Sequence, residues 1–287
     1  MPTVWEKVTE NAKLISLPDI YFRLKAVLDD PDYSMADVTE VISHDPAMTA
    51  RLLRLVNSAY FGFAAKIDTV SRAVGMLGAQ QVHDLVLATS VAGTFDGMSN
   101  PVMNMQRYWL KSVTCAVASR ELAVLCNVLD SERVFVAGLL RDIGHLILYQ
   151  SAPGPAQQAL EHAHKQGVPL YKVERVLLGI CYAKVGGALM RQWNLPRSLW
   201  EPAEFHVEPA MAKEFPLITA IVHIAAVVTE AMQGNQDQQG ALGKVDANAW
   251  QVTGLGVEQC MEIQEKVEKQ LPAVMNLIFP VEKKATA

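Results

Sequence analysis

A lone carboxylate, Asp142, lies within the apolar segment Leu-Leu-Arg-Asp-Ile-Gly-His at residues 139–145. On a continuous helix, the i, i+3/i+4, i+7 spacing places Asp142 on one face with apolar residues such as Phe135, Leu146 and Tyr149. A buried carboxylate must find a metal ion, a cation or hydrogen-bond donors, because burial without partners costs several kcal/mol. The partners of Asp142 therefore decide whether this segment does chemistry.

Other polar side chains lie in apolar helical segments and could be those partners: Lys111, Arg141, Tyr182 and His206. A metal-dependent phosphohydrolase needs several His and Asp ligands that converge from different helices. The pair His162 and His164 does not suit this purpose, because side chains two positions apart on a helix point in different directions. Scattered histidines alone are thus weak evidence for a metal site.

Composition excludes several classes of protein. The 287 residues are 51% hydrophobic and carry a net charge of −5, with no stripe of Lys and Arg, so we expect no nucleic-acid partner. The four cysteines are far apart and form no C-x-x-C pair, which favours buried thiols in a reducing cytoplasm. No targeting segment begins the chain, and the longest apolar stretch, residues 217–228, is too short to span a bilayer. We therefore expect a soluble, cytoplasmic protein without a membrane partner.

Helical periodicity recurs along the chain and strand-like alternation does not, so the sequence predicts an all-α fold, a compact multi-helix bundle. Start signals include a capping box at Ser34 to Asp37 and the pair Asp45-Pro46. The predicted helices cover residues 34–42, 45–58, two segments within 69–93 separated near Gly75 and Gly78, 106–126, 132–149, 156–166, 170–178, 182–193, 197–205, 216–232, and 257–279 with an interruption at Pro272.

Two further motifs have competing interpretations. Residues 44–62 could form a helix-turn-helix with Arg51, Arg54 and Asn57 on one side, but the acidic charge balance favours a core segment that Asn57 and Ser58 terminate. Gly186-Gly187 lies inside a helical pattern rather than before a helix, so it favours close helix packing over phosphate binding.

Several ordered motifs together resemble an HDOD domain over residues 14 to 230. They are His44-Asp-Pro, Leu52 to Gly62, Ala73 to Gly78, Tyr108 to Ser112, Gly138 to Gly144, Glu174 to Gly179, and Trp193-Asn-Leu-Pro followed by His206. The resemblance implies an HD-domain-like fold, related to HD-type metal phosphohydrolases. It predicts an N-terminal helical half at residues 1–98 and a degenerate HD-like half at 99–232. A flexible Gly/Gln-rich loop at 233–248 and a C-terminal helix at 249–287 would follow.

The resemblance also implies where metal ligands would stand. Lys111 occupies the position of the first histidine, Arg141 precedes Asp142 in place of a His-Asp pair, and Tyr182 stands at the next histidine position. His206 matches a histidine, and the closing aspartate falls near an alanine. Two surviving ligand-type residues, Asp142 and His206, do not hold a catalytic ion.

We therefore expect a degenerate metal site at Lys111, Arg141, Asp142, Tyr182 and His206, with no metal, cofactor or catalytic residue. Lys111, Arg141 or both would compensate Asp142, with Lys111 as the better-placed partner because neighbouring positions on a helix diverge by about 100°.

The leading functional hypothesis is a non-enzymatic bacterial signal-transduction or regulatory module that contacts signalling proteins supplied in trans. The alternatives are a residual metal-dependent phosphohydrolase, with His145 or His223 as added ligands, and a pocket that binds a small phosphate-bearing ligand through Lys111 and Arg141.

Overall fold

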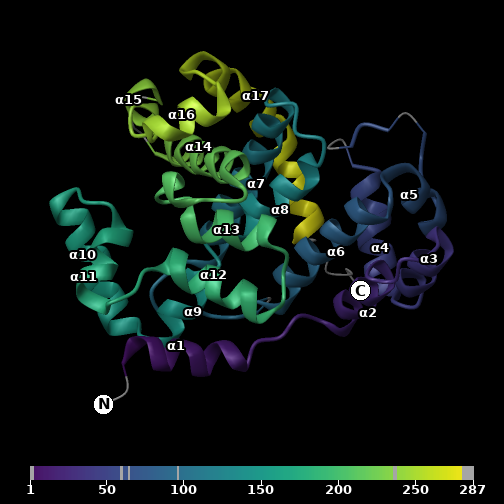
Figure 1. The fold of residues 1–287 in the computed structure, drawn as a ribbon, viewed down its shortest axis with the longest axis horizontal. Helices are drawn as coiled ribbons and strands as arrows, with labels where there is room; N and C mark the ends of the chain where they lie inside the picture. The colour runs from purple at the N-terminus through teal and green to yellow at the C-terminus, as the bar shows by residue number, and fades with distance from the viewer. Residues whose placement is uncertain (1–2, 59–60, 64, 96, 235–237, 280–287) are drawn as a thin grey trace, which may run out of the picture. The chain divides into compact units, whose positions relative to one another are not determined.

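The computed structural model describes residues 3–58, 61–63, 65–95, 97–234 and 238–279, and within these residues every regular element is a helix (Figure 1). This confirms the predicted all-α fold. The chain divides into two compact units, which are described separately. Among the described residues, the first combines those within 1–16 and 97–265, and the second combines those within 17–96 and 266–287.

The second unit begins with five helices: α2 (Asp19–Leu28), α3 (Met35–Ser43), α4 (Pro46–Val56), α5 (Val70–Leu77) and α6 (Ala79–Thr94). The predicted start signals are confirmed, because Ser34 and Asp37 form a capping box and Asp45 accepts a hydrogen bond from the backbone N–H of Met48. Gly78 joins α5 to α6 with a φ of 82°, in the region that glycine adopts without strain.

Asn57 ends α4, as predicted. Its side-chain amide donates to the carbonyl oxygen of Ile67 at 2.6 Å and accepts from the Ile67 N–H at 2.8 Å. Leu52 and Val56 are buried, as the core interpretation of this segment requires. Because the fold uses both ends of the Asn57 amide, this side chain cannot read a base edge in the helix-turn-helix interpretation.

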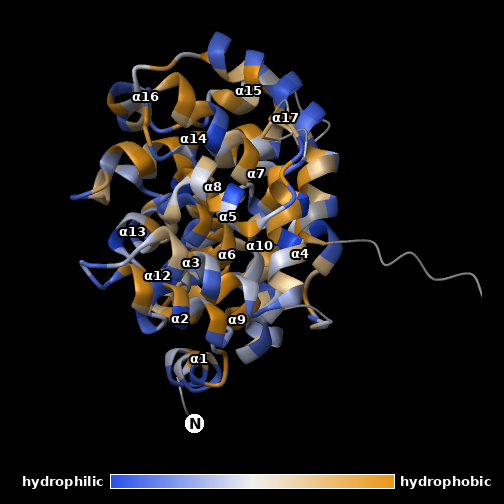
Figure 2. Cartoon of the chain, turned by 90° about the vertical axis from the view of Figure 1, so that its right-hand side faces the viewer, coloured by the Kyte–Doolittle hydropathy of each residue, from blue (hydrophilic) through white to orange (hydrophobic). Residues whose placement is uncertain are grey.

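The first unit contains the remaining helices: α1 (Val4–Lys13), α7 (Met105–Leu125), α8 (Ser131–Leu140), α9 (Gly144–Ser151), α10 (Pro153–Gln166), α11 (Leu170–Leu178), α12 (Tyr182–Gln192), α13 (Arg197–Phe205), the 3-10 turn η1 (Pro209–Met211), α14 (Pro216–Gln233), α15 (Gln238–Leu242), α16 (Ala247–Thr253) and the start of α17 (Val257–Ile278). Helix α7 packs against α8 and α14, and α12 packs against α9 and α13. Hydrophobic residues concentrate where these helices pack together (Figure 2).

Helix α14 is longer than the apolar stretch that the sequence analysis singled out. Among the described helices, it alone is long and apolar enough to cross a membrane by length and composition, and half of it is buried within the protein. It packs against α7, α13 and α16, as the core helix predicted for this segment would.

The predicted helix over residues 132–149 is wrong in one respect, because a turn at residues 141–143 divides it into α8 and α9. Here the N–H of Ile143 bonds to the Leu140 carbonyl at 3.0 Å and that of His145 to the Asp142 carbonyl at 3.0 Å. These i→i−3 bonds tighten the backbone relative to an α-helix. Arg141 and Asp142 therefore lie in a turn rather than on a helix face.

Glycines set the distance between α9 and α12. A Cβ on Gly144 of α9 would overlap the carbonyl oxygen of Tyr182, and Gly186 of α12 meets the backbone of Gly144 at the same crossing. Gly187 plays the same part between α12 and α13, where a Cβ would overlap the Glu204 side chain. The predicted role of Gly186-Gly187 in close helix packing is thus confirmed, and this crossing holds Tyr182 against the turn at residues 141–143.

Other boundaries differ from the prediction for identifiable reasons. Helix α10 begins at Pro153 rather than at the predicted residue 156, because proline at the first helical position needs no N–H partner. Pro272 does not interrupt α17; it is exposed, so the carbonyl that loses its partner can be hydrated. The predicted loop at 233–248 contains α15, and helices α1, α2 and α16 were not predicted.

The predicted half at residues 1–98 does not form one unit. Residues 3–16 pack with the first unit, where Trp193 donates to the carbonyl of Ile15 at 3.0 Å and Gln192 donates to that of Ala12 at 3.0 Å. These bonds join residues that are far apart in sequence, which local patterns do not reveal.

Candidate functional site

Arg141 and Asp142 form a buried ion pair at the centre of the first unit. The Arg141 Nη2 atom lies 2.9 Å from Asp142 Oδ2, and the two side chains are 2% and 7% exposed. The turn allows neighbouring side chains to meet, which a helix would not. The prediction that Lys111 is the better-placed partner is therefore wrong: Lys111 forms an ion pair with Glu230 of α14 instead.

Electrostatics keep this pair ionised. Burial alone would raise the pKa of Asp142, but the Arg141 guanidinium, a hydrogen bond from His206 and the charge of Lys111 together hold it well below its usual range. Burial likewise disfavours the charged form of Arg141, and the Asp142 carboxylate outweighs this and raises the Arg141 pKa. The carboxylate is therefore negative at every physiological pH and is already bound to a fixed cation.

His206 and Tyr182 complete the cluster. His206 Nε2 lies 3.5 Å from Asp142 Oδ1 and 3.5 Å from the Tyr182 hydroxyl, while its Nδ1 lies 3.0 Å from the carbonyl oxygen of Ala203. The Tyr182 ring stacks on His145, with centroids 3.8 Å apart and planes inclined by 18°. The structure thus brings together four of the five predicted site residues and adds His145.

A cavity of about 640 Å³ opens beside this cluster. Its walls come from α7, α9, α10, α11, α14, α15 and adjoining loops, through Val102, Met103, Asn104, Arg107, Tyr108, Lys111, Asp142, His145, Tyr149, Leu160, Leu170, Val227, Glu230, Gln233, Gly234, Ala241 and Lys244. Lys111 and Asp142 belong to this lining, whereas Arg141, Tyr182 and His206 do not. The predicted pocket is therefore divided between the cavity wall and the layer behind it.

The two histidines of the phosphohydrolase alternative differ in availability. His223 uses both ring nitrogens: Nδ1 donates to the carbonyl of His206 at 2.6 Å, and Nε2 accepts from the N–H of Asp246 at 2.9 Å. It has no nitrogen left for a metal ion. His145 lines the cavity, and burial lowers its pKa to about 3, so its imidazole is neutral. His162 and His164 are exposed on α10.

Sequence reasoning did not identify Glu174 as a site residue. It lies fully buried in α11, where Oε2 accepts a hydrogen bond of 2.8 Å from the N–H of Tyr182 at the start of α12. Burial raises the pKa of Glu174 to about 8, and the charge of Asp142 adds to this effect. Its sequence signal is a lone acid in an apolar helical run within one of the HDOD-like motifs.

The donor set around Asp142 does not suit a metal ion. Within the described part of the chain, no group of three or more His, Cys, Asp or Glu side chains is arranged to hold one. The Arg141 guanidinium occupies the side of the carboxylate at Oδ2, and a fixed cation in that position repels a second one.

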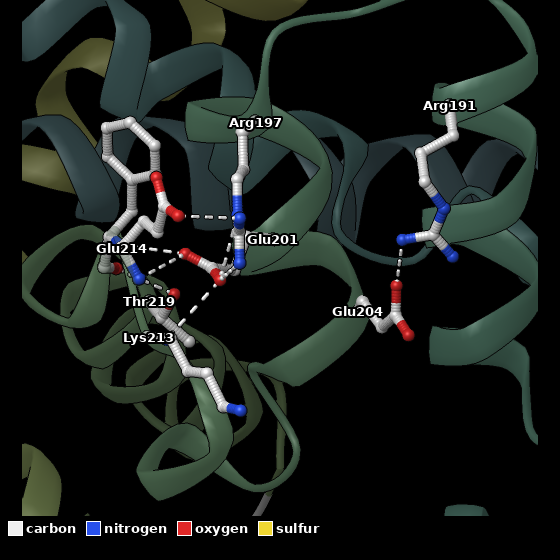
Figure 3. A network of polar contacts seen from close by, with 8 residues as sticks. Arg191, Arg197, Glu201, Glu204, Lys213, Glu214 and Thr219 are labelled. Atoms are coloured by element: carbon white, nitrogen blue, oxygen red, sulfur yellow. Dashed lines mark hydrogen bonds and ion pairs between the residues drawn. The ribbon is translucent and has the colours of Figure 1, made fainter.

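A second polar network lies on α12 and α13 (Figure 3). The buried Glu201 carboxylate accepts hydrogen bonds from the backbone N–H groups of Lys213, Glu214 and Phe215 and from the Arg197 guanidinium. Glu204, also buried, forms ion pairs with partly exposed cations of α12. This network joins helices to the loop before α14, and none of its members lines the cavity.

Residues 14–209 of the chain match the family model of the HDOD domain. An uncharacterized protein of Treponema pallidum (strain Nichols) is 24% identical over 211 residues, which cover 71% of this chain and 40% of that protein. The chain thus spans less than half the length of this relative.

Three solved structures share the fold along nearly the whole chain. An HDOD domain protein of unknown function from Geobacter sulfurreducens is 21% identical with a TM-score of 0.74, covering 94% of this chain and 97% of its own. A Shewanella amazonensis SB2B protein, named provisionally as a phosphohydrolase, is 24% identical with a TM-score of 0.73, covering 95% and 97%. A Marinobacter aquaeolei VT8 protein, named provisionally for signal transduction, is 20% identical with a TM-score of 0.67, covering 91% and 58%.

Proposed function

The chain belongs to the HDOD family, and on this premise we propose that it is a non-enzymatic signal-transduction module of the bacterial cytoplasm. It acts through contacts with signalling proteins supplied in trans, and its former metal centre is a structural ion pair. One observation carries the proposal: the buried Arg141 guanidinium binds the carboxylate that an HD-type enzyme would offer to a metal.

The chemistry of the neighbouring groups supports this assignment. A divalent ion at Asp142 would have to displace Arg141, whose charge would then lie buried without a partner, at a cost of several kcal/mol. Lys111 adds a second positive charge to the same field. His206 offers a single nitrogen toward Asp142, because its other nitrogen faces the Ala203 carbonyl.

The surface of the first unit supports a role in protein contacts. Val176 and Leu177, adjacent on α11, are 83% and 51% exposed, so both are accessible to a partner protein. The closing aspartate of a metal site would fall near Ala226, whose side chain offers no ligand atom.

The decisive experiment measures bound metal by elemental mass spectrometry, in the purified protein and after soaking with manganese, iron and zinc. We expect less than about a tenth of an equivalent, since fewer than three protein ligands are available. Hydrolysis of p-nitrophenyl phosphate with the same ions serves as the activity readout, and we expect none above that of the Asp142→Asn variant.

A gain-of-ligand variant tests the reason for the absence of metal binding. The triple variant Lys111→His, Arg141→His and Tyr182→His restores the donor types at three positions, and we expect it to bind metal where the wild-type protein does not. The matched control carries Lys111→Gln, Arg141→Gln and Tyr182→Phe.

The residual phosphohydrolase remains the competing function, favoured by the neutral His145 on the cavity wall beside Asp142. A stoichiometric ion in the wild-type protein that is lost in both Asp142→Asn and His206→Ala, together with hydrolysis lost in the same variants, would replace the proposal with this alternative.

A further inference from the structure

We propose that a basic, aromatic surface of the second unit binds an acidic peptide segment of a partner protein. The surface is formed by α4, the loop that follows it and α5, and it is called the α4–α5 surface below. Its residues are Arg51, Arg54, Phe61, Phe63, Lys66, Arg72 and Met76. The inference rests on the proposed function in protein contacts, and it names the surface and the chemistry of the partner.

Charge is unevenly distributed along the second unit. Residues 29–45 contain six acidic residues and no lysine or arginine, whereas residues 46–83 contain four lysines and arginines and one acid, Asp68. The segment that forms the α4–α5 surface therefore has a net charge of +3, four positive charges less one negative, in a chain whose total is −5. Such a local positive region attracts an acidic partner and orients its approach.

Hydrogen bonds hold the cations of this segment in one region. Asn57, at the end of α4, forms two hydrogen bonds of 2.6 and 2.8 Å with the backbone of Ile67, so the loop begins and ends at the same place. Arg54 lies one turn before Asn57, and Lys66 directly precedes Ile67. Arg72 Nη1 donates to the carbonyl oxygen of Lys66 at 3.4 Å. The helices α4 and α5 also pack against each other within the second unit (Figure 1).

Most of this positive charge is not used within the protein. The side chains of Arg51, Arg54 and Lys66 form no hydrogen bond or ion pair with the described residues, and those of Arg54 and Lys66 are exposed. Arg72 pairs with Asp68 at 3.3 Å, but both side chains are more than half exposed, so water screens the pair. Carboxylates of a partner can therefore bind here without displacing a buried ion pair.

Apolar side chains lie among these cations. Phe61 and Phe63 stack on each other, with ring centroids 5.9 Å apart and planes inclined by 10°, and Gly62 between them has a φ of 63°. Met76 shares a side of α5 with Arg72, four residues earlier, and is 50% exposed. Aromatic residues, methionine and arginine are enriched in protein–protein interfaces relative to the rest of a protein surface. The α4–α5 surface combines all three.

A short acidic peptide matches this surface better than a nucleic acid does. Phe61 and Phe63 each cover one face of the other, so neither ring can stack with bases on both sides. A nucleic-acid strand would also extend beyond the surface onto a protein of net negative charge, whereas a peptide segment can be confined to it. Guanidinium groups donate paired hydrogen bonds to carboxylates. We therefore expect a segment in which Asp or Glu alternates with apolar residues.

The probe for the test is a fluorescein-labelled synthetic peptide in which Glu and Asp alternate with Leu and Phe. Fluorescence anisotropy with the whole protein measures its binding at low and at physiological salt. We expect saturable binding to one site that weakens as salt rises, because exposed charges contribute to it. One control peptide carries Ser in place of Leu and Phe, and another carries Lys in place of Glu and Asp. Each should bind at least about tenfold more weakly, which corresponds to about 1.4 kcal/mol.

Variants locate the site. The double variant Arg54→Glu with Lys66→Glu should weaken binding of the probe by at least about tenfold, and Met76→Glu should weaken it by about threefold or more. The matched control is Arg23→Glu with Lys165→Glu, which changes the net charge equally at exposed positions outside the surface. It should leave the affinity within about twofold of the wild-type value. Thermal unfolding followed by circular dichroism shows that each variant is folded.

The outcomes separate this inference from the proposed function. Absence of saturable binding overturns the inference, and so does equal weakening by the Arg54 and Lys66 double variant and its matched control. Tighter binding of single-stranded oligothymidylate than of the probe at physiological salt would overturn it in favour of a nucleic acid. Self-association in sedimentation velocity that the double variant abolishes would assign the surface to a second copy of the chain instead. Bound metal and hydrolysis are unaffected by these results and judge the proposed non-enzymatic function separately.

Discussion

Two buried carboxylates of the first unit, Glu201 and Asp142, are each held by an arginine, yet their surroundings differ. Glu201 accepts three backbone N–H groups at 2.7 to 3.3 Å in addition to Arg197, so its donors come from several directions (Figure 3). Around Asp142, the Arg141 Nε and Nη1 atoms and His145 Nδ1 are buried and have no hydrogen-bond partner within the described residues.

The two carboxylates thus differ in whether the buried donors around them have hydrogen-bond partners. Each buried polar atom without a partner costs about 1–3 kcal/mol, so folding alone does not favour their accumulation beside a cavity. The Glu201 network satisfies its donors and holds helices together. The Asp142 cluster, by contrast, has buried nitrogen atoms that its own contacts do not satisfy.

The largest expected effect concerns Glu201. Glu201→Ala leaves three backbone N–H groups without their acceptor and removes one of the two carboxylates that bind Arg197, so we expect a loss of about 4 kcal/mol in the free energy of unfolding. Urea denaturation followed by circular dichroism measures it. A loss below about 1 kcal/mol would show that this network does not stabilise the fold.

Arg141→Met tests whether the second pair is structural as well. It leaves Asp142 charged and buried, and we expect a loss of about 3 kcal/mol by urea denaturation. The double variant Arg141→Met with Asp142→Leu removes both charges and should recover most of that loss. If the double variant is as unstable as the sum of the single changes, the two residues do not act as a pair.

Glu174, near Asp142, should make the free energy of unfolding depend on pH. Its pKa of about 8 in the folded protein exceeds the ordinary value of 4.5, so the native state keeps a proton that the unfolded chain releases. The free energy of unfolding should therefore fall as pH rises from about 5 to 8.

Glu174→Gln removes this contribution. Relative to the variant, the wild-type protein should lose about 4 kcal/mol between pH 5 and pH 8.5, as measured by urea denaturation at each pH. The comparison cancels the opposite contribution of His145, whose lowered pKa reduces stability as pH falls below about 6.5. Parallel curves for the two proteins would contradict the assignment of a raised pKa to Glu174.

The smallest effect is expected at the surface. Arg175 and Glu208 form an ion pair with both side chains more than a third exposed. Arg175→Gln should change the free energy of unfolding by less than about 1 kcal/mol, because water screens such pairs. Urea denaturation measures this change as for the other variants. A loss as large as that of Arg141→Met would show that buried and exposed arginines do not differ in their contribution to stability.

The sequence predicts the helices well where local signals exist. The caps at Ser34 and Asp45 and the break at Gly78 are local chemistry, and the structure confirms them. The sequence also identified Arg141, Asp142, Tyr182 and His206 as one group, through their resemblance to family positions. Their convergence depends on helix packing that no local pattern encodes.

What the sequence did not predict arises from tertiary contacts. The turn at residues 141–143 coincides with the close approach of Gly144 to α12, and it reverses the expected choice of partner for Asp142. Lys111 meets Glu230 of α14 across more than a hundred residues, which periodicity cannot show. Glu174 looks like an ordinary acid in sequence and becomes unusual through complete burial.

The glycine crossing of α9 and α12 has a mechanical consequence. Backbone meets backbone there, so no side chain can change rotamer to absorb a displacement between the two helices. His145 lies on α9 at the cavity wall, and α12 continues to the cations that pair with Glu204 on α13. A displacement of His145 would therefore move α12 with α9, because no side chain at the crossing can absorb it by changing rotamer.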